Sequence, residues 1–122
     1  MIRVSTAPRK RNSPRIAEKS APAFLQWLRG RDCLFEGMAV ACAGKAEAMH
    51  VDYAGGKGIG TKVADRFCVP GCTAHHALQH RLGWDSFETE IRIAQGATLI
   101  FANGYWDRWP GRVAWERKLA DG

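Results

Sequence analysis

The stretch Cys72-Thr-Ala-His75-His76-Ala-Leu-Gln-His80 decides the fold, because it places four metal-binding side chains within nine residues. Cys72 and His75 are three residues apart, so at the start of a helix they can reach one tetrahedral zinc ion. His76 and His80 are four residues apart, so on a helix they project from one face and can hold a second cation. The pattern predicts a helix over residues 73–82, ended by Gly83, that serves two metals.

A structural zinc ion needs two further ligands, and the upstream cysteines are the candidates. All cysteines and histidines of the chain lie within one segment of 48 residues. We find no secretory signal, so we expect a metal site rather than disulfides. We predict the ligand set Cys33, Cys42, Cys72 and His75, with sets that include Cys68 as the alternative. Such an ion can contribute about 10–16 kcal/mol of apparent binding energy to folding.

His50 is the candidate general base. It stands at the end of an expected strand, upstream of the two histidines that share a helix face. An imidazole titrates near neutral pH, so it can take a proton from water. Asp65 could orient His50 or give a hard carboxylate oxygen to the cation. It could equally be a loop aspartate that caps the next turn.

The positive charge of the chain is concentrated at one end. The 122 residues carry a net charge of +6, and residues 1–20 hold six lysines or arginines against one glutamate. We therefore predict a flexible basic arm over residues 1–19 and one domain over residues 20–122. A basic arm binds DNA phosphates, although a solubilising terminus has the same composition. The predicted DNA contacts are Arg9, Lys10, Arg11, Arg15, Lys57 and Lys62.

Composition and motifs exclude several other classes. The chain is 46% hydrophobic and 25% charged, as in soluble globular proteins, and has no apolar run of about 18 residues that could span a membrane. We expect a cytoplasmic protein with no membrane partner. The glycine-rich stretch 54–62 lacks the Gly-Lys-Ser/Thr ending of a P-loop. We expect it to be either a DNA-contacting loop or a plain connector.

Local signals predict the remaining elements. Ser20 and Gly30 bracket a helix with Pro22 in its first turn. Residues 33–53 are expected to form a β-hairpin that turns at residues 44–45, and residues 66–70 a short extended segment. Asp85 and Ser86 can cap a helical pattern that continues to about residue 106, with Gly96 as its weak point. Residues 109–111 break this pattern, and the last residues form a short helix or an extended tail.

Together these motifs resemble the HNH (His-Me finger) endonucleases, most closely the Ref-type phage recombination-enhancement nucleases and related phage HNH proteins. The resemblance runs from about Cys33 to Glu88 and includes His50-Val-Asp-Tyr, the glycine-rich stretch, Asp65-Arg-Phe and Val69-Pro-Gly-Cys72-x-x-His75-His76-x-x-Gln-His80. It implies an α+β fold with a small zinc-bound ββα-metal core and flanking helices.

The resemblance also implies roles for single residues. It places His50 as the general base, His76 and His80 around a catalytic Mg²⁺ or Mn²⁺, and Cys72 and His75 in the structural zinc site. The family's middle asparagine falls near Phe67, and Asp65 stands in for it. A basic N-terminal region that binds DNA and a recombinase filament as partner are further implications.

Two other functions remain as alternatives. A zinc nucleobase deaminase has H-x-E followed by P-C-x-x-C, whereas this chain has Asp52 in place of the glutamate and an extra residue before Cys72. A catalytically silent zinc module that only binds DNA would keep the zinc site and the basic arm. Three C-terminal tryptophans could stack on bases or pack in the core: Trp106, Trp109 and Trp115.

Overall fold

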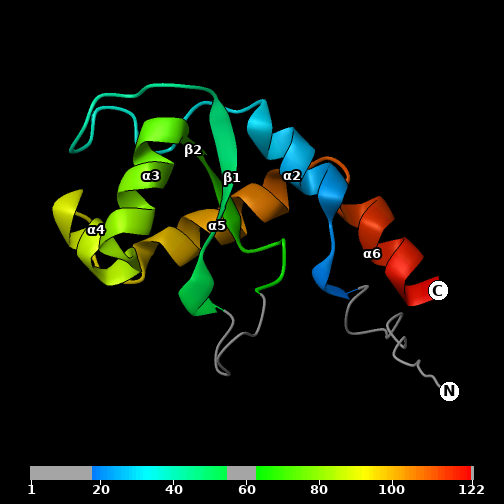
Figure 1. Cartoon of the computed structure of the whole chain (residues 1–122). Coiled ribbons are helices and arrows are strands. Elements are labelled where there is room, and N and C mark those ends of the chain that lie inside the picture. Colours follow the sequence, from blue (N-terminus) through cyan, green and yellow to red (C-terminus); the bar gives the residue numbers. More distant parts are fainter. Residues whose placement is uncertain (1–17, 55–62, 122) are drawn as a thin grey trace, which may run out of the picture.

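The computed structural model describes residues 18–54 and 63–121, which form an α+β structure with a small antiparallel sheet (Figure 1). The six predicted DNA contacts, Arg9, Lys10, Arg11, Arg15, Lys57 and Lys62, lie outside these residues. The elements are α2 (Pro22–Arg29), β1 (Ala46–His50), the 3-10 turn η2 (Asp52–Ala54), β2 (Cys68–Cys72), α3 (Thr73–Leu82), α4 (Trp84–Glu90), α5 (Ala97–Arg108) and α6 (Arg112–Asp121). None of the helices in the described part of the chain is long and apolar enough to cross a bilayer.

The sheet joins segments that are distant in the sequence. β1 pairs with β2 in antiparallel register, from Ala46 opposite Cys72 to His50 opposite Cys68. The hairpin predicted within residues 33–53 is therefore wrong, since only its second half is a strand. Residues 33–43 form turns instead, with Gly37 and Ala39 at positive φ, and these turns bring two cysteines towards the start of α3.

Each face of the sheet covers a separate apolar cluster. Met49 and Val69 belong to one cluster, with residues of α3, α4 and α5. Cys68 faces the other, where it is buried with residues of α2 and α5. Alternate strand residues point to opposite faces, so this division follows from the strand period. Cys68 therefore packs in this second apolar cluster and is not part of the metal cluster, as the preferred zinc ligand set requires.

The C-terminal tryptophans serve the core. Trp106 and Trp109 are buried against Phe24 of α2, with ring centroids 5.0 and 5.4 Å from the Phe24 ring. Trp115 packs edge-on against Trp106 and donates its indole N–H to the Ser20 carbonyl. These side chains hold α2, α5 and α6 together, so base stacking by them is not supported.

Helix boundaries agree with the sequence where short-range signals dominate. α3 spans residues 73–82 as predicted, and Gly30 ends α2 as predicted. Ser20 does not cap α2, because Ala21 is the N-cap and its N–H is accepted by the Asp65 carboxylate at 2.9 Å. Gly83, rather than Asp85 or Ser86, is the N-cap of α4.

The predicted continuous helical pattern up to residue 106 is divided into α4 and α5. Gly96 adopts a left-handed conformation between them. The buried Glu88 carboxylate accepts N–H groups from Gly96 and Thr98 at 2.8 and 3.2 Å, and the Tyr53 hydroxyl at 2.6 Å. A carboxylate is favourable at a helix N-terminus, so Glu88 fixes the start of α5.

Glu88→Gln is expected to lower the free energy of unfolding by about 2 kcal/mol at neutral pH, because hydrogen bonds to charged groups contribute about 1.5–3 kcal/mol. Burial raises the pKa of Glu88, but its hydrogen bonds outweigh this and place the pKa below the ordinary 4.5. The contribution is therefore present above the unfolded-state pKa and is lost as pH falls through the folded-state value. Urea unfolding of wild type and variant with zinc present should show a difference that shrinks in acid. A pH-independent difference, or an equal loss in the exposed neighbour variant Glu90→Gln, would contradict this.

Candidate metal centre and histidine pocket

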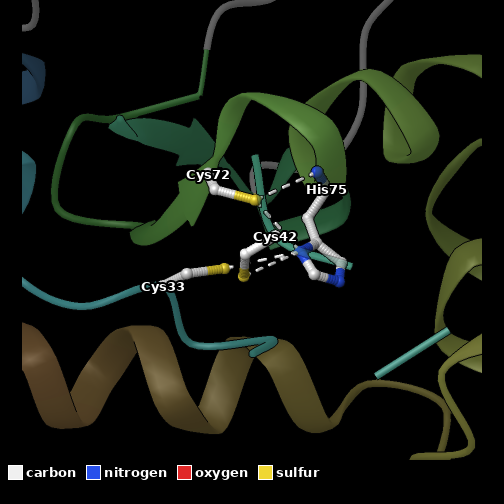
Figure 2. Close-up of side chains that lie close together, drawn as sticks. All are labelled: Cys33, Cys42, Cys72 and His75. Atoms are coloured by element: carbon white, nitrogen blue, oxygen red, sulfur yellow. Dashed lines mark hydrogen bonds between the residues drawn. The ribbon is translucent and has the colours of Figure 1, made fainter. Parts of the chain in front are cut away.

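Four side chains from three parts of the chain converge at the start of α3 (Figure 2). The ligand atoms of Cys33, Cys42, Cys72 and His75 all lie within 4.8 Å of one another. The sulfur atoms lie 3.6, 3.7 and 3.2 Å from His75 Nδ1, in that order. Three thiols and one imidazole in a closed group are a typical donor set for structural zinc. The cluster is the set predicted from the spacing.

Backbone groups orient these ligands. The His75 Nε2–H donates to the Met38 carbonyl at 2.7 Å, which leaves Nδ1 unprotonated and facing the sulfurs. The Phe35 N–H points at Cys33 Sγ, and the His75 N–H points at Cys72 Sγ, each at 3.4 Å. Partners of this kind fix the tautomer and orientation of metal ligands. The turn at residues 33–40 therefore orients the ligands as well as contributing one of them.

The cluster favours the thiolate form of Cys72 and disfavours the thiolate form of Cys42, as the directions of their pKa shifts indicate. Burial raises the pKa of Cys72, but hydrogen bonds from backbone and side-chain neighbours outweigh it and bring the value from 9.0 to about 6. Desolvation of Cys42, with hydrogen bonds and repulsion from the other thiols, raises its pKa to about 12. A cation would relieve this repulsion, because a coordinating thiol is deprotonated by the ion.

A second group lies on the exposed face of α3. His76 and His80 direct their Nε2 atoms at each other, 3.1 Å apart. Two nitrogens that bind one ion at about 2.0–2.1 Å lie about 3.3 Å apart in tetrahedral geometry. The pair is therefore close to the spacing that a shared cation requires. The predicted same-face placement of the two histidines is confirmed.

Glu47 of β1 supports this pair and was not predicted from the sequence. Its carboxylate accepts the Nδ1–H of His76 at 2.6 Å and the Thr73 hydroxyl at 2.9 Å. These hydrogen bonds lower the pKa of Glu47, so it is ionised at neutral pH. With the proton held on Nδ1, His76 Nε2 keeps a lone pair, which is directed at His80 Nε2. Only the β1–β2 register, which sets Glu47 opposite Gly71, could have revealed this contact.

His50 is held by Asp65. Its Nε2 lies 3.0 Å from one Asp65 oxygen, and the other oxygen accepts the Ala21 N–H. Asp65 also donates its own N–H to the Lys19 carbonyl. Of the three roles considered for Asp65, the geometry favours orientation of His50, since both carboxylate oxygens already have partners.

The three histidines surround one pocket of about 350 Å³, which a single substrate group could enter. Its walls come from the end of β1, the segment that precedes β2, and the exposed face of α3. The lining residues are Ala48, His50, Asp52, Val63, His76, Gln79 and His80. Asp65 is not among them, so it contacts the pocket only through His50.

Comparisons with known proteins add no assignment. No protein-family model matches the chain, and no similar curated protein or solved structure was found. The function is therefore inferred from the two clusters of side chains, the Cys33, Cys42, Cys72 and His75 cluster and the histidines of the pocket.

Glu47→Gln is expected to weaken binding of a cation at His76 and His80 by about 10–100-fold, the usual effect of removing a partner of a ligating histidine. The neutral amide no longer stabilises the proton on His76 Nδ1. Mn²⁺ titration followed by electron paramagnetic resonance would measure the affinity, with the exposed Glu90→Gln as the control. Equal affinities in wild type and Glu47→Gln would show that Glu47 does not act through His76.

Proposed function

We propose that the protein is a metal-dependent DNA endonuclease of HNH type, which hydrolyses phosphodiester bonds. The observation that carries the proposal is the pocket that His50 lines together with the His76–His80 pair. A general base opposite a cation site is the arrangement that metal-assisted hydrolysis requires. The order β1, β2, α3 supports the proposal, because it is the order expected of a ββα-metal core.

In this proposal, His50 removes a proton from the attacking water. Asp65 accepts the Nε2–H of His50, so Nδ1 is the nitrogen with a free lone pair. The same carboxylate is tied to the Ala21 N–H, so the imidazole is held at the pocket wall. A general base placed in this way contributes about 10²–10⁴-fold to rate.

His76 and His80 would hold the catalytic cation, which supplies charge stabilisation at the phosphate and at the leaving oxygen. Imidazole is a ligand for first-row transition metals, whereas Mg²⁺ prefers oxygen ligands. We therefore expect activity with Mn²⁺ to exceed that with Mg²⁺. The Cys33, Cys42, Cys72 and His75 cluster would hold a structural zinc ion that fixes the first turn of α3 and so positions His76.

DNA is the proposed partner, because the net charge of +6 is concentrated in residues 1–20. Backbone contacts from this segment and from Lys57 and Lys62 would anchor the substrate without reading its sequence. A role in phage or prophage recombination, with a recombinase filament as a second partner, extends the same proposal.

Nicking of supercoiled plasmid and of circular single-stranded DNA tests the proposal. With Mn²⁺ or Mg²⁺, the wild-type protein is expected to convert plasmid to open circles and to linearise the single-stranded circles. A DNA shift on a gel with no cleavage under any of these conditions would favour the silent zinc module. Release of ammonia from cytosine or adenine, without strand cleavage, would favour the deaminase.

A further inference from the structure

A second depression, of about 640 Å³, lies where the C-terminal ends of α2 and α5 meet. It is separate from the histidine pocket, since the two share no lining residue. The side chains that give it chemical character are Trp27, Arg31, Asp32, Tyr105 and Arg108. The proposed hydrolysis uses none of them.

Each arginine in this depression lies over an aromatic ring. The Arg31 guanidinium carbon is 4.9 Å from the centroid of the Trp27 ring, and that of Arg108 is 4.7 Å from Tyr105. The two rings are neighbours, with centroids 6.4 Å apart. The Arg108 side chain passes close to Gly104 on its way to Tyr105. A Cβ atom at residue 104 would lie only 3.2 Å from the Nη1 atom of Arg108. The result is a continuous aromatic and cationic wall.

Both guanidinium groups keep their hydrogen-bonding capacity for a ligand. Within residues 18–54 and 63–121, the ion pairs join His50 to Asp65, His76 to Glu47 and Arg112 to Glu116, and none involves Arg31 or Arg108. Arginine fork geometry matches phosphate oxygens. Asp32 provides one acceptor on the same wall, and a carboxylate at a nucleotide site can accept the exocyclic amino group of cytosine.

We propose that this depression binds an unpaired nucleotide of a DNA strand, with its phosphate on Arg31 and Arg108 and its base against the wall formed by Trp27 and Tyr105. Only an unpaired base offers its face to aromatic and guanidinium planes. The inference rests on the proposed function in taking DNA as the partner. The inference adds a second site, separate from the histidine pocket, that binds a single DNA strand.

The first test is the salt dependence of binding to oligodeoxycytidine. Binding is measured without divalent cation, in a His50→Ala background, so cleavage does not enter. Removing the phosphate contact by Arg31→Gln with Arg108→Gln should lower the slope of log K against log salt by about 0.7 and weaken binding about 5-fold at about 0.1 M salt. The matched control changes the exposed pair Arg117→Gln and Lys118→Gln of α6, which lies outside the depression. Equal losses in the two pairs, or no loss in the first, would overturn the inference.

The second test locates the base. An oligodeoxycytidine with one 5-iodocytosine is irradiated on the protein, and the cross-linked peptides are identified by mass spectrometry. Cross-links at Trp27 or Tyr105 with the single strand, absent with the same strand in a duplex, are expected. Cross-links confined to other residues would overturn the inference, even if the protein cuts DNA. A protein that binds no DNA at all would overturn both this inference and the proposed function.

Discussion

Cys72→Ser is expected to release the zinc ion and unfold the domain. The cluster joins the turn at residues 33–43 to the junction of β2 and α3. Few hydrogen bonds connect these segments otherwise, such as those from the Leu34 N–H to the Pro70 carbonyl and from the Ala74 N–H to the Ala43 carbonyl. The zinc contribution of about 10–16 kcal/mol is as large as the whole stability of a typical domain, about 5–15 kcal/mol.

Zinc content by mass spectrometry and helix content by circular dichroism would measure this effect. Cys68→Ala is the matched control, because Cys68 is a buried cysteine outside the cluster. The control should keep one zinc ion per chain and remain folded, whereas Cys72→Ser should lose both zinc and helix signal. A folded Cys72→Ser protein with full zinc content would show that the cluster is not the zinc site.

His50→Ala is expected to lower the rate of DNA cleavage by at least about 100-fold, because it removes the proposed general base. The His50 side chain is 29% exposed and lies outside the zinc cluster, so zinc content and DNA binding should stay at the wild-type level. Single-turnover nicking, with zinc content measured on the same samples, would check this. A variant that cuts at the wild-type rate would remove His50 from the mechanism.

Asp65 provides a companion experiment that separates orientation from metal binding. Asp65→Ala is expected to slow cleavage, because His50 loses the acceptor of its Nε2–H. If Asp65 acts only through His50, then adding Asp65→Ala to His50→Ala should cost little more, since residues that work as a unit are not additive. A double variant in which the two losses multiply would instead indicate an independent role as a cation ligand.

The sequence was informative wherever a few neighbouring residues carry the signal. The bounds of α3 and the pairing of Cys72 with His75 follow from spacing within one helical turn. The set of cysteines was also predicted, because Cys68 lies in an expected extended segment where its side chain can point into the core, and it is buried in the apolar cluster with residues of α2 and α5. Zinc binds few kinds of side chain, so the ligands that can join Cys72 and His75 are restricted to a small set of residues.

Long-range contacts were not predictable in the same way. β1 and β2 pair although a long segment separates them in the sequence. The apolar and polar residues of β1 alternate too little to predict which strand it pairs with. The contacts of Glu47 with His76 and of Met38 with His75 depend on that pairing and on the turn geometry before it. Likewise, the apolar periodicity predicted one helical pattern through residues 91–96. In the structure the Glu88 carboxylate accepts the N–H groups of Gly96 and Thr98, and a new helix begins there.

We propose that α3 serves two metals, a structural zinc at its first turn and a catalytic cation on its exposed face. The most direct test is Mn²⁺-dependent plasmid nicking by wild type and by His76→Ala with His80→Ala, with zinc content measured on both. We expect one zinc ion per chain in both proteins and nicking by wild type alone. Nicking by the double variant at the wild-type rate, or loss of its zinc, would show that α3 does not hold two separate metals.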